Sequence, residues 1–369
     1  MGSKERERRR RAGSRETKKD RKTKGIVKSA KQFLLDLAFA GVIVLAIMGG
    51  LFAYSGVWPP LVVVESGSMQ HDERSGVRSS IGVIDTGDLV VVKRASTQDE
   101  IVTYVRGRGQ GANGHATYGE FGDVIVYRKN GGGATPVIHR AFLRVQWNDQ
   151  TLSWDVPELQ NLKYGNDWTR DGGPQGFTDF ERFDGIDAEK KSHKAIINYV
   201  GYSKRNITIN FWWLEPGTTG YITLGDNAET NKRPDQAIGS GISDGKPVKF
   251  EWVVGVARGE IPCFGLIKLF VGNSFDKSNY EKSPNGQKWC ALGMVVTIIA
   301  VPLVYDITKE QIRRRKVERG ELGEDEEMEG PVKKLVRLVK RKLLKKGDEG
   351  TRRRRRRPGS KAISDENEA

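Results

Sequence analysis

The sequence predicts a mainly β fold, in which an antiparallel β domain lies between two membrane-spanning helices. Short segments rich in valine and isoleucine recur between turn signals through the middle of the chain, which is typical of strands. No run of ten or more residues in this region has helical periodicity. Two long apolar stretches flank the region, one on each side.

The first apolar stretch covers residues 33–54, and Asp36 is the only charged residue among its 22 positions. About 20 residues in a helix cross a bilayer core, so we expect a transmembrane helix. A cleaved signal peptide is the alternative, but its apolar core is usually about 7–15 residues long. The second stretch, residues 289–305, has 17 residues and no charge, and Pro302 inside it is tolerated in a membrane helix.

The net charge of the 369 residues is +15, and this charge lies in the two tails. Residues 1–32 carry 14 Lys and Arg against 4 Asp and Glu, and residues 306–369 carry 21 against 14. The nearly neutral middle argues against a specific nucleic-acid-binding domain. Basic flanks stay cytoplasmic by the positive-inside rule. We therefore expect a multi-pass protein of the cell membrane, with residues 55–288 external and both termini cytoplasmic.

Seven segments between the apolar stretches are expected to be strands. They are Leu61–Val64, Asp88–Val92, Val124–Tyr127, Val137–Phe142, Ile207–Trp212, Tyr221–Leu224 and Lys249–Val256. Three Gly-rich pieces, Gly107–Gly114, Gly131–Gly133 and Gly172–Gly176, are expected to be surface loops. Residues 148–202 are polar and rich in Asp, Gly and Lys, which indicates an insertion outside the part of the domain that would carry a catalytic site.

Two features near the second apolar stretch and the C-terminal tail bear on the membrane. Ile261–Phe270 is apolar but too short to span, and it fits either a buried strand or a segment in the bilayer interface. Cys263 and Cys290 are expected to be two buried or lipid-facing thiols. Pro331–Lys346 reads as a basic amphipathic helix, and Arg352–Arg357 follow it, so we expect contact with anionic membrane lipid. Contact with a translocon or ribosome is the alternative.

Ser68 is the strongest candidate for a nucleophile. It follows the β-branched run Val62–Val64 in a Gly-containing turn, 14 residues beyond Tyr54. Extended chain covers about 3.3 Å per residue, so Ser68 lies within about 45 Å of the end of the first span. A serine hydroxyl is a weak nucleophile and needs a base within hydrogen-bond reach.

His139 is the preferred base among the four histidines, because a strand-like segment would hold its ring. His115 and His193 lie in polar surroundings, and His71 is three residues after Ser68 and remains a rival base.

A histidine base usually needs a carboxylate that orients the ring. Asp226 and Asp235 are nine residues apart in an Asp- and Asn-rich stretch that follows a predicted strand. By default such a stretch is only a turn, but two aspartates in one loop make it a candidate site.

Five short boxes follow one another along the chain. They are Ser66-Gly67-Ser68-Met69, Thr86-Gly87-Asp88-Leu89-Val90, Gly122-Asp123-Val124-Ile125-Val126-Tyr127, Val137-Ile138-His139-Arg140 and Gly225-Asp226-Asn227. In this order they resemble the type I signal peptidases of the archaeal and endoplasmic-reticulum branch. The resemblance covers residues 33–142 and 220–269, and it leaves out both tails and most of residues 148–202. It implies a coiled antiparallel β catalytic domain whose apolar face rests on the membrane.

By position, the resemblance implies that Ser68 is the acylated nucleophile and His139 the general base, where the bacterial branch has lysine. Asp235 is implied as the third member of the triad and Asp226 as a structural or assisting acid, or the reverse. The Ser68 amide, with or without the Ser66 hydroxyl, would form the oxyanion hole.

Two positions depart from the family pattern. His71 stands where the nucleophile box usually has proline, and Asp235 follows Asp226 by nine residues where the family spacing is about six. The longer spacing leaves the choice between the two acids open. Lys93 and Lys129 lie outside the matching box, which disfavours a bacterial Ser-Lys pair.

The resemblance implies a serine-type signal peptidase that cleaves signal peptides from secreted or membrane precursor proteins at the external membrane face. Its pocket would prefer small side chains before the cut, as in A-x-A signal-peptide ends. The four histidines have no metal-ligand spacing, so we expect neither metal nor cofactor. Two alternatives remain: a dedicated membrane peptidase with a narrow substrate set, and a non-catalytic membrane-anchored β-domain that binds lipid or the translocation machinery.

Overall fold

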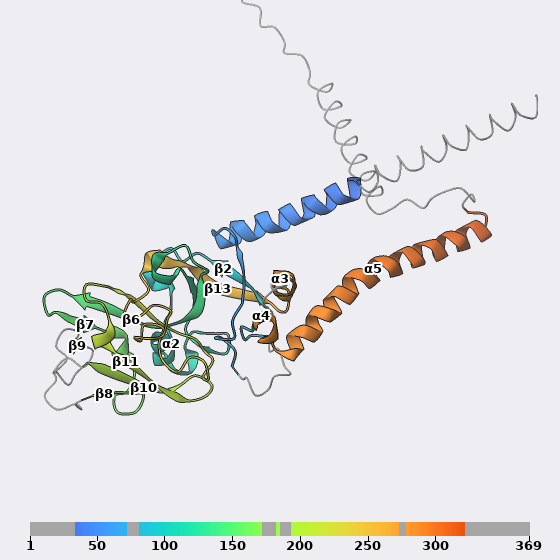
Figure 1. Ribbon diagram of the computed structural model, residues 1–369. Coiled ribbons are helices and arrows are strands. Elements are labelled where there is room, and N and C mark those ends of the chain that lie inside the picture. The colour runs from blue at the N-terminus through green and yellow to red at the C-terminus, as the bar shows by residue number, and fades with distance from the viewer. Residues whose placement is uncertain (1–33, 72–80, 172–181, 185–192, 273–277, 322–369) are drawn as a thin grey trace, which may run out of the picture. The chain divides into compact units, whose positions relative to one another are not determined.

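The computed structural model describes residues 34–71, 81–171, 182–184, 193–272 and 278–321 (Figure 1). The chain divides into two compact units: residues 45–297 form one, and residues 1–44 with 298–369 form the other. The predictions for the tail residues 1–32, for Pro331–Lys346 and Arg352–Arg357, and for Gly172–Gly176 lie outside the described residues.

Two helices are long and apolar enough to cross a membrane. The first is Leu34–Ser55, and the second is α5, Asn285–Glu318, which contains Pro302. Neither is buried by protein along its most apolar window. The prediction of two apolar helices beside a β domain is confirmed. The helix α5 extends beyond residues 289–305 on both sides.

The strands of the β domain are short except for β6 and β13. They are β1 (Leu61–Val63), β2 (Leu89–Lys93), β3 (Ala116–Thr117), β4 (Glu120–Phe121), β5 (Val124–Tyr127), β6 (Val137–Asn148), β7 (Ser153–Asp155), β8 (Trp168–Arg170), β9 (Arg182–Asp184), β10 (Lys194–Val200), β11 (Arg205–Asn210), β12 (Gly220–Leu224) and β13 (Val253–Ile261). Three short helices accompany them: α2 (Tyr104–Gly109), α3 (Leu266–Gly272) and α4 (Ser278–Glu281).

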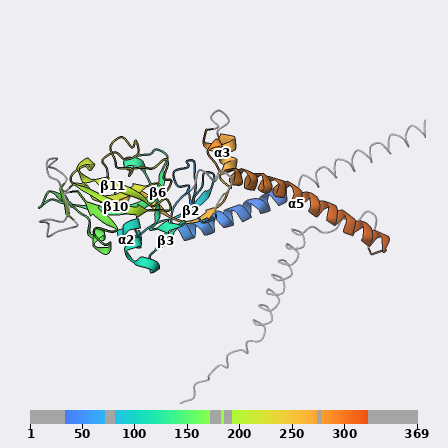
Figure 2. The ribbon, with the colours of Figure 1, turned by 90° about the horizontal axis from the view of Figure 1, so that it is seen from below.

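The main sheet has eight strands in the order β1-β2-β13-β5-β6-β7-β9, and β12 also pairs with β6. A second sheet has the order β11-β10-β8. Every pair of these strands is antiparallel, so the predicted mainly antiparallel β class is confirmed. Figures 1 and 2 both show β10 and β11 at the end of the domain away from α3.

The long strand β6 positions two neighbouring side chains on opposite faces of the sheet. His139 pairs with Ile125 of β5, and Arg140 pairs with Val124 of β5 and Leu224 of β12. Successive side chains of a strand point to opposite faces. His139 and Arg140 therefore meet different partners although they are adjacent in sequence.

Residues 148–202, which are polar on average, contain several strands and buried aromatic residues. They contribute β7, β8, β9 and β10, and these strands enclose an aromatic core with Trp154, Trp168 and Phe183 fully or almost fully buried. The ring of Phe183 stacks on that of Phe211 with centroids 4.2 Å apart. A few inward aromatic residues are enough to build a core, and a polar average composition hides them.

Two expectations for local segments are wrong in part. Gly107 belongs to α2 rather than to a surface loop, and a Cβ there would lie 2.6 Å from the carbonyl oxygen of His115. Ile261–Phe270 is not one buried strand, because β13 ends at Ile261 and α3 begins at Leu266. Leu266 is buried, whereas Phe270 is exposed.

The sequence-based expectation of two free thiols is wrong. Cys263 and Cys290 form a disulfide. It joins the turn before α3 to the second turn of α5. Beside it, the buried carboxylate of Asp88 accepts hydrogen bonds from the backbone N–H of Cys263 at 3.2 Å and from Gln287 Nε2 at 2.5 Å. Burial raises the pKa of Asp88 in spite of these bonds. The start of α5 is therefore attached to the β domain at two points.

The aromatic core predicts that Trp154→Ala lowers the free energy of unfolding by about 3–5 kcal/mol, because a fully buried ring is replaced by a cavity. Trp212→Ala is the matched control: this ring is 48% exposed, so the change stays within about 0.5 kcal/mol. Denaturant unfolding of the full chain in detergent measures both values. Equal losses would contradict the assigned core.

Candidate active site

Ser68 lies in a turn that follows β1 and is held by buried neighbours. Met69 is fully buried, and the side chain of Gln70 reaches Thr86 at 3.3 Å. Ser68 itself is half-buried, and its Oγ lies 3.1 Å from the Oγ of Ser66. The flanking residues therefore fix the turn while the hydroxyl of Ser68 stays accessible.

The carbonyl oxygen of Ser68 is bound by the loop that follows β12. It accepts hydrogen bonds from the backbone N–H of Asn227 at 2.9 Å and from Asn231 Nδ2 at 3.0 Å. Asn227 Nδ2 also donates to the carbonyl of Gly67 at 2.9 Å. Gly225 permits this approach, since a Cβ there would lie 2.6 Å from the Ser68 oxygen.

His139 is buried, and its Nδ1 lies 2.6 Å from Oδ2 of Asp235. The same carboxylate oxygen accepts hydrogen bonds from Tyr127 Oη at 2.9 Å and from Thr223 Oγ1 at 2.7 Å. Burial, with the nearby charge of Asp235, raises the pKa of Tyr127 well above its ordinary value. The phenol therefore stays protonated and donates to Asp235.

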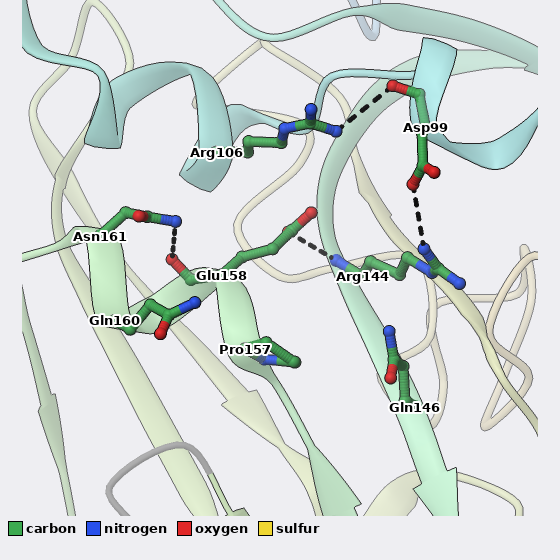
Figure 3. A pocket seen from close by; sticks show the side chains of 8 residues that line it. All are labelled: Asp99, Arg106, Arg144, Gln146, Pro157, Glu158, Gln160 and Asn161. Atoms are coloured by element: carbon green, nitrogen blue, oxygen red, sulfur yellow. Dashed lines mark hydrogen bonds and ion pairs between the residues drawn. The ribbon is translucent and has the colours of Figure 1, made fainter.

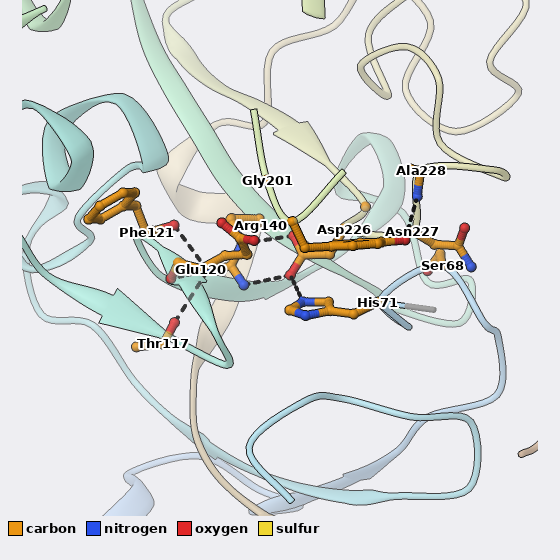
Figure 4. A network of polar contacts seen from close by, with 12 residues as sticks. Ser68, His71, Thr117, Glu120, Phe121, Arg140, Gly201, Asp226, Asn227 and Ala228 are labelled. Carbon is orange, nitrogen blue, oxygen red and sulfur yellow. Dashed lines mark hydrogen bonds and ion pairs between the residues drawn. The ribbon is translucent and has the colours of Figure 1, made fainter. Parts of the chain in front are cut away.

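Asp226 has a different set of partners (Figure 4). Its two carboxylate oxygens receive Arg140 Nε at 2.8 Å and Nη2 at 2.6 Å, and His71 Nε2 lies 3.3 Å from Oδ2. Burial disfavours the charged carboxylate, but the guanidinium of Arg140 and the ring of His71 outweigh it and lower the pKa of Asp226 to about 2. His71 also stacks on Tyr202, with ring centroids 4.9 Å apart.

Ser66, Ser68 and His139 line one cleft of about 870 Å³, which also has apolar walls from Val62 and Ile138. In the described part of the chain no hydrogen bond joins Ser68 to His139. Such contacts often tighten only when substrate is bound.

A second cleft of about 630 Å³ shares Ser66, Gly67 and Ser68 with the first, and it is bounded by Ser283 and Asn285 at the start of α5. Ser68 therefore stands where two clefts meet.

A smaller pocket of about 210 Å³ lies apart from these clefts and shares no lining residue with them (Figure 3). Its lining carries two acids and two arginines, and within it Arg144 pairs with Asp99 at 3.7 Å while the carboxylate of Glu158 accepts from the backbone N–H of Arg144 at 3.0 Å. We assign no ligand to it. Among the described residues, no group of three His, Cys, Asp or Glu side chains could hold a metal ion.

Ser66, Ser68 and His139 line one cleft, and Asp235 does not line it but contacts Nδ1 of His139. Asp226 contacts Arg140 and His71 instead. His71, the rival base, does not line either cleft beside Ser68.

The contacts of Tyr127, Thr223 and Asn231 with the site residues were not expected from the sequence. In the sequence, only one feature of Tyr127 and Thr223 points to the site. Each is a hydroxyl residue in a predicted strand, Tyr127 at its end and Thr223 inside it.

No known protein family matches this chain, and no curated protein or solved structure matches it either.

The environment of Asp226 predicts how stability depends on pH. Its pKa in the folded protein lies below the ordinary 3.8, at about 2, so the ionised carboxylate stabilises the fold above about pH 4 and this contribution is lost as the pH falls toward 2. We expect wild type to lose about 2 kcal/mol more unfolding free energy than Asp226→Asn between about pH 5 and pH 2. Denaturant unfolding at several pH values measures this, and parallel curves would contradict it.

Proposed function

We propose that this chain is a membrane-anchored serine endopeptidase of the signal peptidase type, which cleaves signal peptides from secreted or membrane precursor proteins. The observation that carries the proposal is the cleft that Ser68 and His139 both line, together with the contact of 2.6 Å between Asp235 and the ring of His139. A nucleophile, a base and an acid that orients the base are the three parts that serine peptidases need.

The hydrogen bond between His139 and Asp235 supports the assignment of His139 as the base. When Nδ1–H donates to the Asp235 carboxylate, Nε2 is left without a proton and can accept one. Tyr127 and Thr223 donate to the same carboxylate, which fixes its orientation. Asp235 therefore fits the third member of the triad better than Asp226, whose carboxylate is engaged by Arg140.

The reaction then follows the usual acyl-enzyme course. Ser68 Oγ attacks the scissile carbonyl carbon while its proton passes to His139 Nε2, and the imidazolium gives this proton to the departing amine. Water repeats the sequence on the ester and releases the signal peptide with a free carboxylate. For attack, the Ser68 hydroxyl must donate to His139 Nε2, whereas its oxygen lies 3.1 Å from the hydroxyl of Ser66 in the structure. The Ser68 amide, with or without the Ser66 hydroxyl, would stabilise the oxyanion.

The first cleft also supports the substrate class. Val62, Val126 and Ile138 give it apolar walls close to Ser68, which suits the small apolar residues at signal-peptide ends. The helix Leu34–Ser55 ends 13 residues before Ser68, which limits the distance between the nucleophile and that end of the helix to about 43 Å.

The disulfide supports an external β domain. Structural disulfides persist in oxidising compartments and are rare in the cytosol, and Cys263–Cys290 lies between the β domain and α5. This agrees with cytoplasmic tails and an external site.

Cleavage of a precursor with an intact signal peptide tests the catalytic proposal. Ser68→Ala and His139→Ala should each lower the rate at least about 10³-fold, since the acylation step loses its nucleophile or base. Asp235→Asn should lower kcat more than Asp226→Asn, because only Asp235 contacts the ring of the base.

His115→Ala is the matched control for the histidine variants, because His115 also pairs with a buried carboxylate, Asp123 at 2.8 Å, but lies outside both clefts. It should process precursor at the wild-type rate. Wild-type processing by Ser68→Ala would instead support the non-catalytic membrane β-domain.

Thiol alkylation tests the external placement. In membranes prepared without reductant, neither Cys263 nor Cys290 should react, and two alkyl groups should be added per chain after unfolding and reduction. Mass spectrometry of the intact chain reads the number of groups. Two groups added after unfolding without reductant would contradict the disulfide and the oxidising location inferred from it.

A further inference from the structure

Arg205, the first residue of β11, binds the backbone of the loop that holds Ser68. Its Nη1 donates to the carbonyl oxygens of Asn227 at 3.1 Å and Asn231 at 2.6 Å. Its Nη2 donates to the carbonyls of Gly225 at 2.8 Å and Asp226 at 3.4 Å. One guanidinium therefore spans the loop from Gly225, its first residue, to Asn231, its last residue in contact with Ser68.

The loop transmits this contact directly to the nucleophile. Asn227 and Asn231 each accept from Arg205 through their carbonyl oxygens and each donate to the carbonyl oxygen of Ser68. Two hydrogen bonds in series, through the same two residues, join the guanidinium to Ser68. Removal of the guanidinium would take one donor from each of four carbonyl oxygens. It would also loosen the loop that holds the Ser68 carbonyl in position.

The β10–β11 turn contacts the same surroundings at a second point. Tyr202 stacks on His71, and its hydroxyl accepts a hydrogen bond from the backbone N–H of Ala228 at 3.4 Å. His71 in turn contacts Asp226. The sheet β11-β10-β8, in which β8 and β10 come from residues 148–202, thus contacts the surroundings of the Ser68 turn at two points.

We propose that Arg205 is a positioning residue for Ser68, and that the β11-β10-β8 sheet acts in the reaction through it. The proposal rests on the peptidase function proposed above. It assigns Arg205 no contact with substrate: the guanidinium keeps the Ser68 turn at the distance from His139 that attack requires. Displacement of a reacting group by about 1 Å can cost about 10²-fold in rate.

Arg108 provides a matched control. It lies on α2 and also binds the second sheet, through the carbonyl oxygen of Asn198 at 2.5 Å and the carboxylate of Asp167 at 2.8 Å. It makes no contact with the loop 225–231 among the bonds of the described residues. Loss of Arg108 therefore weakens the attachment of the same sheet without releasing the Ser68 turn.

The experiment compares wild type, Arg205→Ala, Arg205→Lys and Arg108→Ala as full chains in detergent, with precursor cleavage and thermal unfolding as readouts. We expect kcat to fall about 10- to 100-fold in both Arg205 variants, with KM within about twofold. Lysine keeps the charge and the fold, but a single nitrogen cannot span four carbonyls. Arg108→Ala should lower the unfolding temperature but leave kcat within about twofold.

Two further readouts separate positioning from general stability. Added guanidinium at millimolar concentration should restore part of the kcat of Arg205→Ala and none in Arg108→Ala. Amide hydrogen exchange of residues 225–231 should accelerate in the Arg205 variants alone, and this readout needs no activity.

Wild-type kcat in both Arg205 variants, or an equal loss of kcat in Arg108→Ala, would overturn the positioning role. A parallel Ser68→Ala arm separates this from failure of the peptidase proposal itself. If Ser68→Ala blocks cleavage while Arg205→Lys cleaves normally, only the positioning role is wrong.

Discussion

The hydrogen bonds from Asn227 and Asn231 to the carbonyl oxygen of Ser68 are the interaction on which the rest of the site depends. They join segments up to 163 residues apart in the chain, and they are possible only because Gly225 has no side chain in the way. The loop that makes them begins at the end of β12, which pairs with the strand that carries His139. The same loop therefore holds the turn of Ser68 and carries Asp226 and, nine residues later, Asp235.

The two acids differ in what neutralises them, and this difference separates their roles. The guanidinium of Arg140 donates to both carboxylate oxygens of Asp226. The negative charge of Asp226 is therefore balanced, which fits a structural role. Asp235 is surrounded by two neutral hydroxyls and one imidazole. Its negative charge is left for the imidazole to balance, and an imidazolium that forms during a reaction would be stabilised there. Two aspartates thus acquire different chemical properties from their surroundings.

The sequence was sufficient to predict the strands near Ser68 and His139 and the two apolar helices, because alternation and length are local properties. It also allowed Ser68, His139 and the two acids to be proposed as candidates. The partners of Asp226 and Asp235 could not be predicted, because Arg140 and His139 lie 86 and 96 residues away from them in the chain. The aromatic core within residues 148–202 and the contacts of Arg205 were out of reach, because both depend on long-range packing of an outwardly polar segment.

The disulfide has a consequence for the order in which the molecule is made. Every strand that the structure describes precedes Cys263 in the chain, and Cys290 follows it after 27 residues, inside the helix that comes last. During synthesis from the N-terminus, the second sulfur becomes available only after all of these strands have left the ribosome. During synthesis the disulfide therefore cannot guide the pairing of these strands. It forms only after they have been made, and it then links the finished β domain to α5.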